Sequence, residues 1–171
     1  MASLIEDLME TLDREEKLYA NLIPIQEEKI RAIVANDLDA LSHLSTSEQK
    51  LVDEVGNLEN KRIQVTEDIA TVLGKVPGTM NLEQIIQVLG KQPAEQKQLQ
   101  ILHDRLRRTI ARLQELNAQN KELLTQALEM VEYNMNVIRS TRMSSGSSNY
   151  SSNAAQVDIA DYGAGMFDAK Q

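Results

Sequence analysis

The sequence of 171 residues contains no cysteine and no tryptophan, and only one phenylalanine and four tyrosines. Without cysteine the chain forms no disulfide and has no thiolate for catalysis or metal binding. No apolar run approaches the roughly 18 to 20 residues of a membrane-spanning helix, and the first residues, MASLIEDLMETLDREE, are acidic where a signal peptide is basic. We therefore expect a cytoplasmic protein without membrane insertion.

Positive charge and catalytic side chains are also scarce. The formal net charge of -8 argues against nucleic acid as a partner, because phosphate binding needs a basic surface. Di-iron helical bundles place a glutamate three residues before a histidine, but Ala40 and Gln100 stand there, before His43 and His103. No glycine-rich phosphate loop is present either. We predict no catalytic, metal or cofactor-binding residues, which leaves an enzyme as the weakest of three hypotheses.

What the sequence does contain is aliphatic residues at helical spacing. Apolar steps of three and four predict long helices over residues 3–35, 38–73 and 93–142, and a short helix over residues 81–90. Pro24 falls inside the first helix, where we expect a kink rather than an end, because the periodicity resumes after it. The predicted fold class is all-α: an elongated antiparallel hairpin or bundle of three long helices plus one short helix, resembling a coiled coil.

Connection lengths and charge predict how these helices are arranged. The short link near Asn36 and Asp37 makes the first two long helices antiparallel, and the short helix is too small to cross the bundle. The last helix then starts beside the start of the first and runs parallel to it. Residues 1–20 carry a net charge of -4 and residues 97–112 a net charge of +4, so these two segments are complementary as neighbours.

Polar residues interrupt the apolar seams at a few positions. In the second helix the seam from Leu41 to Val72 is broken only by Glu48 and Arg62. In the last helix the seam is Leu99, Leu102, Leu106, Thr109, Leu113, Leu116, Asn120, Leu123, Ala127, Met130, Asn134 and Val137. Polar seam residues are either paired with a neighbouring helix, where they fix the register, or they mark an open and partly hydrated groove.

The composition changes to serine, asparagine and glycine after residue 142. The sequence therefore predicts a helical domain over residues 1–142 and a flexible tail over residues 143–171, since such a composition buries too little apolar surface to fold. The tail also contains apolar residues that suit either a short recognition segment or an idle solvated end: Val157, Ile159, Tyr162, Met166 and Phe167.

One stretch of the last helix connects the pattern to a known family. The segment LNAQNKELL, with the spacing Asn117-x-x-Asn120-x-x-Leu123-Leu124, follows a long hairpin that carries Glu48 and Arg62 ahead of TVLG. In order and spacing, residues 3–140 resemble the FlgN family of flagellar type III export chaperones. The segment MFDAKQ is also similar to endings in that family from Gram-positive bacteria.

The resemblance implies a cytoplasmic chaperone without a cofactor. Its implied partners are the hook-associated proteins FlgK and FlgL, whose C-terminal helical region it would bind and keep unpolymerised, and the flagellar export gate, to which it would deliver them. The last helix has too few helical neighbours to cover its C-terminal half, so we predict partner-binding residues there. They are Asn117, Asn120, Leu123, Leu124, Leu128, Met130, Val131, Asn134 and Ile138.

Two alternatives stay open at this point. Asn117 and Asn120 serve either the docking of a partner helix or an internal contact that caps the first helix. The chain as a whole is either an export chaperone or a structural coiled-coil adaptor that dimerises through its heptad seams, with weak self-association left open in the first case.

Overall fold

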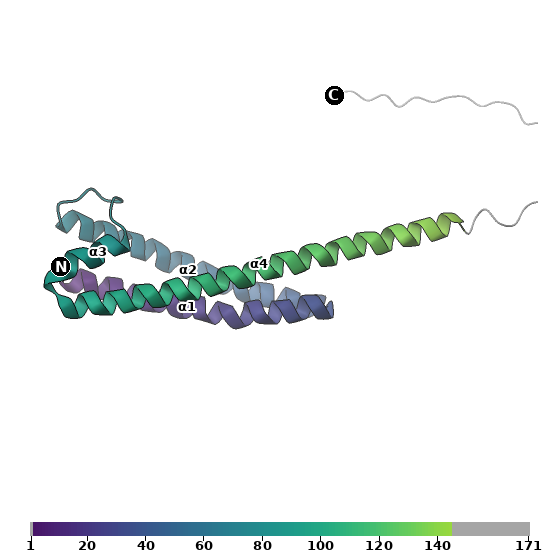
Figure 1. Ribbon diagram of the computed structural model, residues 1–171, viewed down its shortest axis with the longest axis horizontal. Coiled ribbons are helices and arrows are strands. Elements are labelled where there is room, and N and C mark those ends of the chain that lie inside the picture. Colours follow the sequence, from purple (N-terminus) through teal and green to yellow (C-terminus); the bar gives the residue numbers. More distant parts are fainter. Residues whose placement is uncertain (1, 145–171) are drawn as a thin grey trace, which may run out of the picture. The chain divides into compact units, whose positions relative to one another are not determined.

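The computed structural model describes residues 2–144, which form four α-helices and no strand. These are α1 (Ala2–Ala35), α2 (Leu38–Val72), α3 (Leu82–Val88) and α4 (Pro93–Ser144), with a 3-10 turn η1 (Leu89–Lys91) between α3 and α4 (Figure 1). The all-α fold class is confirmed. The predicted tail lies outside the described residues, except that α4 continues through its first two positions.

The chain divides into two compact units, Met1–Val131 and Glu132–Gln171. The first unit holds α1, α2, α3, η1 and α4 as far as Val131, with α2 antiparallel and α4 parallel to α1, as predicted (Figure 1). In the second unit, the described residues are the last turns of α4. Within residues 2–144, no helix combines the length and apolar composition of a membrane span.

Asn36 and Asp37 link α1 to α2, and each takes a different backbone conformation. Asn36 takes a left-handed conformation with φ of 54°, which asparagine tolerates better than most residues. The Asp37 N–H then donates to the Ala32 carbonyl oxygen at 2.9 Å, which completes the C-terminal cap of α1. The Asp37 side chain accepts a hydrogen bond from the Ala40 N–H at 2.9 Å and so begins α2. Asp37 is therefore the N-cap of α2.

A side-chain cap also begins the short helix α3. Asn81 and Gln84 form a capping box, in which each side chain accepts from the other residue's backbone N–H at 2.9 Å. The helix was predicted to reach Gly90, but the α-helical part ends at Val88 and a 3-10 turn follows. Pro93 then occupies the first position of α4, where its missing N–H costs no helical hydrogen bond.

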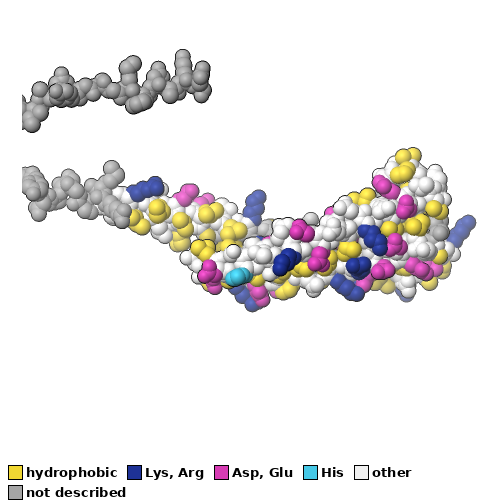
Figure 2. All heavy atoms as spheres, turned by 180° about the vertical axis from the view of Figure 1, so that it is seen from behind, with side chains coloured by type: hydrophobic (Ala, Val, Ile, Leu, Met, Phe, Trp, Pro, Cys, Tyr) yellow, Lys and Arg dark blue, Asp and Glu magenta, His cyan; other side chains and the backbone are white. Residues whose placement is uncertain are grey.

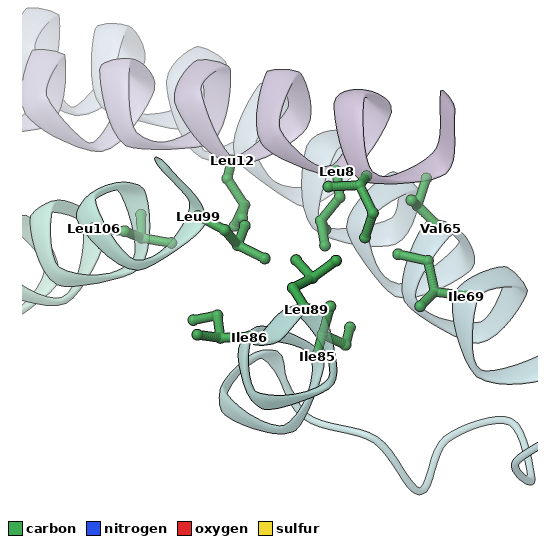
Figure 3. Close-up of a cluster of buried hydrophobic side chains, with 10 residues drawn as sticks. Leu8, Leu12, Val65, Ile69, Ile85, Ile86, Leu89, Leu99 and Leu106 are labelled. Atoms are coloured by element: carbon green, nitrogen blue, oxygen red, sulfur yellow. The ribbon is translucent and has the colours of Figure 1, made fainter. Parts of the chain in front are cut away.

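The main apolar core lies where all four helices meet. Its side chains point toward one another between the helices (Figure 3) and comprise Ile5, Leu8, Leu12, Val65, Ile69, Ile85, Ile86, Leu89, Leu99 and Leu106. Burying an aliphatic side chain of this size contributes roughly 1.5 to 3 kcal/mol. This cluster holds α3 against the three long helices, at the end of the first unit where α4 starts.

Both polar interruptions of the α2 seam are paired with α1. Arg62 Nε donates to Glu15 Oε2 at 2.9 Å, and the Glu15 side chain is only 2% exposed. Glu48 Oε2 accepts from Lys29 Nζ at 2.7 Å. The pairing interpretation of Glu48 and Arg62 is therefore confirmed: each residue is matched by an α1 side chain and fixes the register of the hairpin.

The complementary charge patches of α1 and α4 also meet. Arg105 donates from Nη2 to Asp13 Oδ1, and its Nε lies 3.1 Å from Glu16 Oε2 although that N–H makes no hydrogen bond. Thr109 donates to Glu16 Oε1 at 2.9 Å. Arg112 Nη2 lies 3.3 Å from Glu27 Oε1. Glu27 is outside residues 1–20, the acidic segment that was predicted to pair with these arginines.

The predicted seams lose their cover at their C-terminal ends. In α4, Leu113, Leu116 and Asn120 are buried, whereas Met130, predicted to continue that seam, is exposed. The later seam positions Asn134 and Val137 are exposed as well, and so is Val72 at the end of α2. These four positions continue the predicted periodicity, but no described helix packs over them; in α4 this agrees with the predicted shortage of neighbours over its C-terminal half.

We expect the Arg105 ion pairs to contribute to stability more than the other α4 arginines do. Arg105→Glu should lower the free energy of unfolding by about 1 to 2 kcal/mol, because it places a third carboxylate beside Asp13 and the largely buried Glu16. Adding Asp13→Lys should restore part of the loss. The matched control Arg108→Glu, at an exposed position without an ion pair in the described chain, should change stability by less than about 0.5 kcal/mol. Urea denaturation at low salt measures all three, and equal effects at positions 105 and 108 would contradict the pairing.

We also expect Glu15 and Asp13 to affect the pH dependence of stability in opposite directions. Burial raises the pKa of Glu15 above 4.5, and the Arg62 charge only partly offsets this. Hydrogen bonds from Lys17 and then Arg105 lower the pKa of Asp13 below 3.8. Glu15 therefore contributes stability below pH 4.5 that is lost as pH rises through its raised folded-state pKa. Asp13 contributes stability above pH 3.8 that is lost as pH falls through its lowered folded-state pKa.

Comparison of the wild type with Glu15→Gln and Asp13→Asn tests both signs. As pH falls from 7 through the raised pKa of Glu15, the wild type should gain stability relative to Glu15→Gln. Relative to Asp13→Asn it should lose stability, but only below about pH 3.8. Denaturation curves across this range measure both differences. A shift of the same sign for the two variants would refute the assignment.

Candidate functional site

Asn120 lies at the point where α4 stops being covered by α1. Its side chain is 4% exposed, and its Nδ2 donates to the Gln26 backbone carbonyl at 3.0 Å and to Gln26 Oε1 at 2.8 Å. Because both facing groups are acceptors, only the amide nitrogen can point toward Gln26. The Asn120 Oδ1 atom is buried and has no hydrogen-bond partner in the described part of the chain.

The Asn120 contact continues across α1 to α2. Gln26 is 2% exposed, and its Nε2 donates to Glu48 Oε1, while Glu48 also accepts from Lys29. A single chain of hydrogen bonds therefore crosses three helices in one layer. We call Asn120, Gln26, Glu48 and Lys29 the polar layer. Connected polar groups of this kind fix one alignment of the helices, because shifting any of them leaves buried partners unpaired.

Asn117 and Asn120, the two asparagines of the segment LNAQNKELL, have different environments. Asn117 is exposed, whereas Asn120 is buried against α1. The internal contact to α1 is thus present for Asn120. Within residues 2–144, the Asn117 side chain makes no hydrogen bond. Partner binding by either residue stays a prediction.

Beyond the polar layer, α4 exposes most of its large apolar side chains. Leu123 is half-buried, but Leu124 is 36% exposed and Leu128 is 65% exposed. Met130 and Val131 are 68% and 56% exposed. In the second unit, the predicted site residues Asn134 and Ile138 are exposed too. Figure 2 shows hydrophobic side chains gathered along this part of α4.

The exposed residues form a row of their own. Leu124, Leu128 and Val131 are separated by steps of four and three, so they share one face of α4 beside the seam that contains Asn120. We call these three residues the apolar row. The same steps continue in the second unit with Met135 and Ile138. The prediction omitted Met135, and also the exposed Tyr133 and Val137; extending the four-three steps would have found Met135.

Within the described residues, no three histidine or carboxylate side chains are grouped to hold a metal ion. A cavity between Ile5, Ile69 and Ile85 has a volume of about 180 Å³, and open hollows of about 400 to 450 Å³ lie elsewhere on the described chain, but none of them is lined by the apolar side chains of the C-terminal half of α4. The geometry instead offers an exposed apolar helix face, which is suited to contact with another protein.

Comparison with known proteins agrees with this description. The family model "FlgN protein" matches residues 1–157. The chain therefore belongs to the FlgN family, which is a family of flagellar export chaperones and not of enzymes, and whose partners are flagellar hook-associated proteins. The chain is 27% identical over 131 residues to the uncharacterized protein YvyG of Bacillus subtilis (strain 168), covering 77% of this chain and 78% of that protein. No solved structure gives a significant match.

We expect the two asparagines to respond differently to substitution. Asn120→Ala removes the donor to two buried Gln26 oxygens and should lower the free energy of unfolding by about 1 to 3 kcal/mol. The matched control Asn117→Ala, one turn away, should leave stability unchanged or raise it by about 0.5 kcal/mol, because alanine is the better helix former. Thermal and urea unfolding of the pair measure this, and equal losses would show that Asn117 is also held internally.

Proposed function

We propose that this chain is a cytoplasmic export chaperone for the hook-associated proteins FlgK and FlgL. It binds their C-terminal helical region on the C-terminal half of α4, keeps them unpolymerised and delivers them to the flagellar export gate. Family membership supports the chaperone role and the general partner class. The observation that carries the location is the apolar row, which no described helix covers.

The apolar row has the geometry of a helix-binding surface. Residues at steps of four and three along one face meet the matching face of a second helix, as the a and d positions of a coiled coil do. Leu124, Leu128 and Val131 would supply the apolar contacts, and Leu123 would extend them toward the covered seam. Burying this face on a partner removes apolar surface from water, which is the main source of affinity in such contacts.

Methionine makes the surface adaptable. Met130 is 68% exposed beside the row, and its flexible, polarisable side chain can pack against partner helices of different shape. This suits a chaperone that binds two related proteins. Asn134 and Ile138, in the second unit, are proposed as further contacts to the same partner helix.

The asparagines have separate proposed roles. Asn117 is exposed and is proposed to give a polar contact to the partner at the N-terminal edge of the surface. Asn120 is proposed to act on binding by holding α4 against α1 through the polar layer, so that the surface begins at a fixed point.

A structural adaptor that dimerises through α4 is the second candidate function. It is favoured by the same four-three steps, since an apolar row also serves pairing between two copies. The candidates differ in the free protein: an adaptor is a tight dimer at micromolar concentration, whereas a chaperone with a vacant surface is a monomer or associates weakly. Sedimentation equilibrium of the purified chain separates them.

We expect substitutions in the apolar row to affect partner binding and leave folding intact. Leu128→Glu should change the free energy of unfolding by less than about 0.5 kcal/mol, because the side chain is 65% exposed. It should weaken binding to purified FlgK or FlgL by about tenfold or more, the range of an anchor residue. Isothermal titration calorimetry and circular dichroism measure the two effects.

A matched control is available at the other end of the hairpin. Val76→Glu also places a charge at an exposed aliphatic position, 68% exposed in the connector that follows α2, outside the apolar row. It should leave partner binding unchanged. If Leu128→Glu unfolds the chain, the row belongs to the core; if it folds and binds normally, the partner docks elsewhere.

A further inference from the structure

Lys121 is a charged residue on the face of the apolar row. It precedes Leu124 by three residues and Leu128 by seven, so it lies on the helix face that these side chains share. The Lys121 side chain is exposed, and within residues 2–144 it forms no hydrogen bond and no ion pair. No acidic residue stands three or four positions away from it in α4, the separations at which helical side chains pair. The N-terminal end of the apolar row therefore carries a cation without a matching carboxylate in the described chain.

The other charges in this part of α4 lie on a different face. Between residues 117 and 131 they are Glu122 and Glu129, which are seven residues apart and so share a face with each other. Glu122 is two residues from Leu124 and Glu129 is one residue from Leu128, and residues at these separations do not face the same way. Glu122 also accepts a hydrogen bond from Gln126 at 3.3 Å. A partner on the apolar row thus meets one positive charge and no negative charge within this stretch.

The polar layer fixes the position of this positive charge. Lys121 follows Asn120, whose buried amide nitrogen donates to two oxygens of Gln26 in α1. The helix is therefore held at the residue next to Lys121, at the point where cover by α1 ends. A partner helix that lies on Leu124 and Leu128 meets the lysine at one end of the contact, always at the same helical separation.

We propose that Lys121 determines which helices fit the apolar row and in which register. The occupant is an amphipathic helix whose apolar residues, at steps of four and three, contact Leu124, Leu128 and Val131. One helical turn further along the same face, this helix carries an aspartate or glutamate, which pairs with the Lys121 ammonium group. This inference rests on the proposed function, because the occupant is a helix of the exported partner.

The charge restricts how a partner helix can slide along the row. Apolar residues at steps of four and three repeat every seven residues, so a helix shifted by one such repeat, about 10 Å, still presents an apolar face. A shift in one direction places the partner's carboxylate against Leu128, which is seven residues after Lys121. A shift in the other direction places an apolar residue against the Lys121 charge. Only one register therefore satisfies both the apolar contacts and the ion pair.

Carbodiimide cross-linking tests the ion pair directly, because it joins an amine to a carboxylate only where the two groups are in contact. The full chain in complex with purified FlgK or FlgL is cross-linked and digested, and mass spectrometry identifies the joined peptides. We expect Lys121 to be linked to one aspartate or glutamate in the partner's C-terminal helical region. Lys97, which is also exposed in α4 but lies outside the row, should give no link to that region.

Substitution of Lys121 separates its charge from its packing. Lys121→Glu should weaken binding to the same protein by about fivefold to tenfold at low salt and by less at high salt. Lys121→Met keeps an apolar stem without the charge and should weaken binding by about threefold. Lys121→Arg should keep binding within about twofold and abolish the cross-link, because the guanidinium group keeps the charge but is not an amine.

A charge exchange and a matched control complete the test. Replacing the cross-linked carboxylate of the partner with lysine should restore binding to Lys121→Glu, whereas Lys97→Glu, with the same change in net charge, should bind as the wild type does. If Leu128→Glu weakens binding and Lys121→Glu does not, or if Lys121→Met binds as tightly as the wild type, this inference is overturned and the proposed function stands. A wild-type chain that binds neither FlgK nor FlgL would overturn both.

Discussion

Buried polar side chains of α1 fix the positions of both other long helices. Glu15 receives Arg62 from α2, and Gln26 joins Asn120 of α4 to Glu48 of α2. Aliphatic packing alone tolerates small rotations and shifts of helices, whereas a buried carboxylate or amide loses its partner when the register changes. The central helix of the first unit thus determines the alignment, and the apolar core provides the greater part of the stability.

The polar layer also marks the position along α4 after which the apolar side chains of this helix are exposed. Up to Asn120, α4 is held by α1 through hydrogen bonds, ion pairs and buried leucines. After it, the helix continues with an equally regular apolar pattern but without comparable cover. A helix that would be an ordinary third member of a bundle therefore has a second apolar row that no described helix covers, and no moving part is required to expose it.

Periodicity and connection length were sufficient to predict the helices, the antiparallel hairpin and the parallel α1–α4 pair, because these follow from local sequence and chain geometry. The sequence did not distinguish Asn117 from Asn120, since which of two neighbouring amides is buried depends on how α4 is rotated against α1. Nor did it show that the cover of α4 ends after Asn120, because the apolar steps continue regularly through Met130. An apolar position is buried only where a neighbour exists, and the extent of the neighbour is a tertiary property.

The nearly constant spacing between the buried and part-buried hydrogen-bond partners of α1 and α4 limits how the chain can change in length. Contacts join residues 92, 93 and 94 positions apart, from Arg105 and Asp13 through Thr109 and Glu16 to Asn120 and Gln26. One residue inserted in either helix between these points would turn all later side chains by about 100° and break the remaining pairs. Insertions and deletions are therefore compatible with this fold in the connector of residues 73–81, where no helix has to keep its phase.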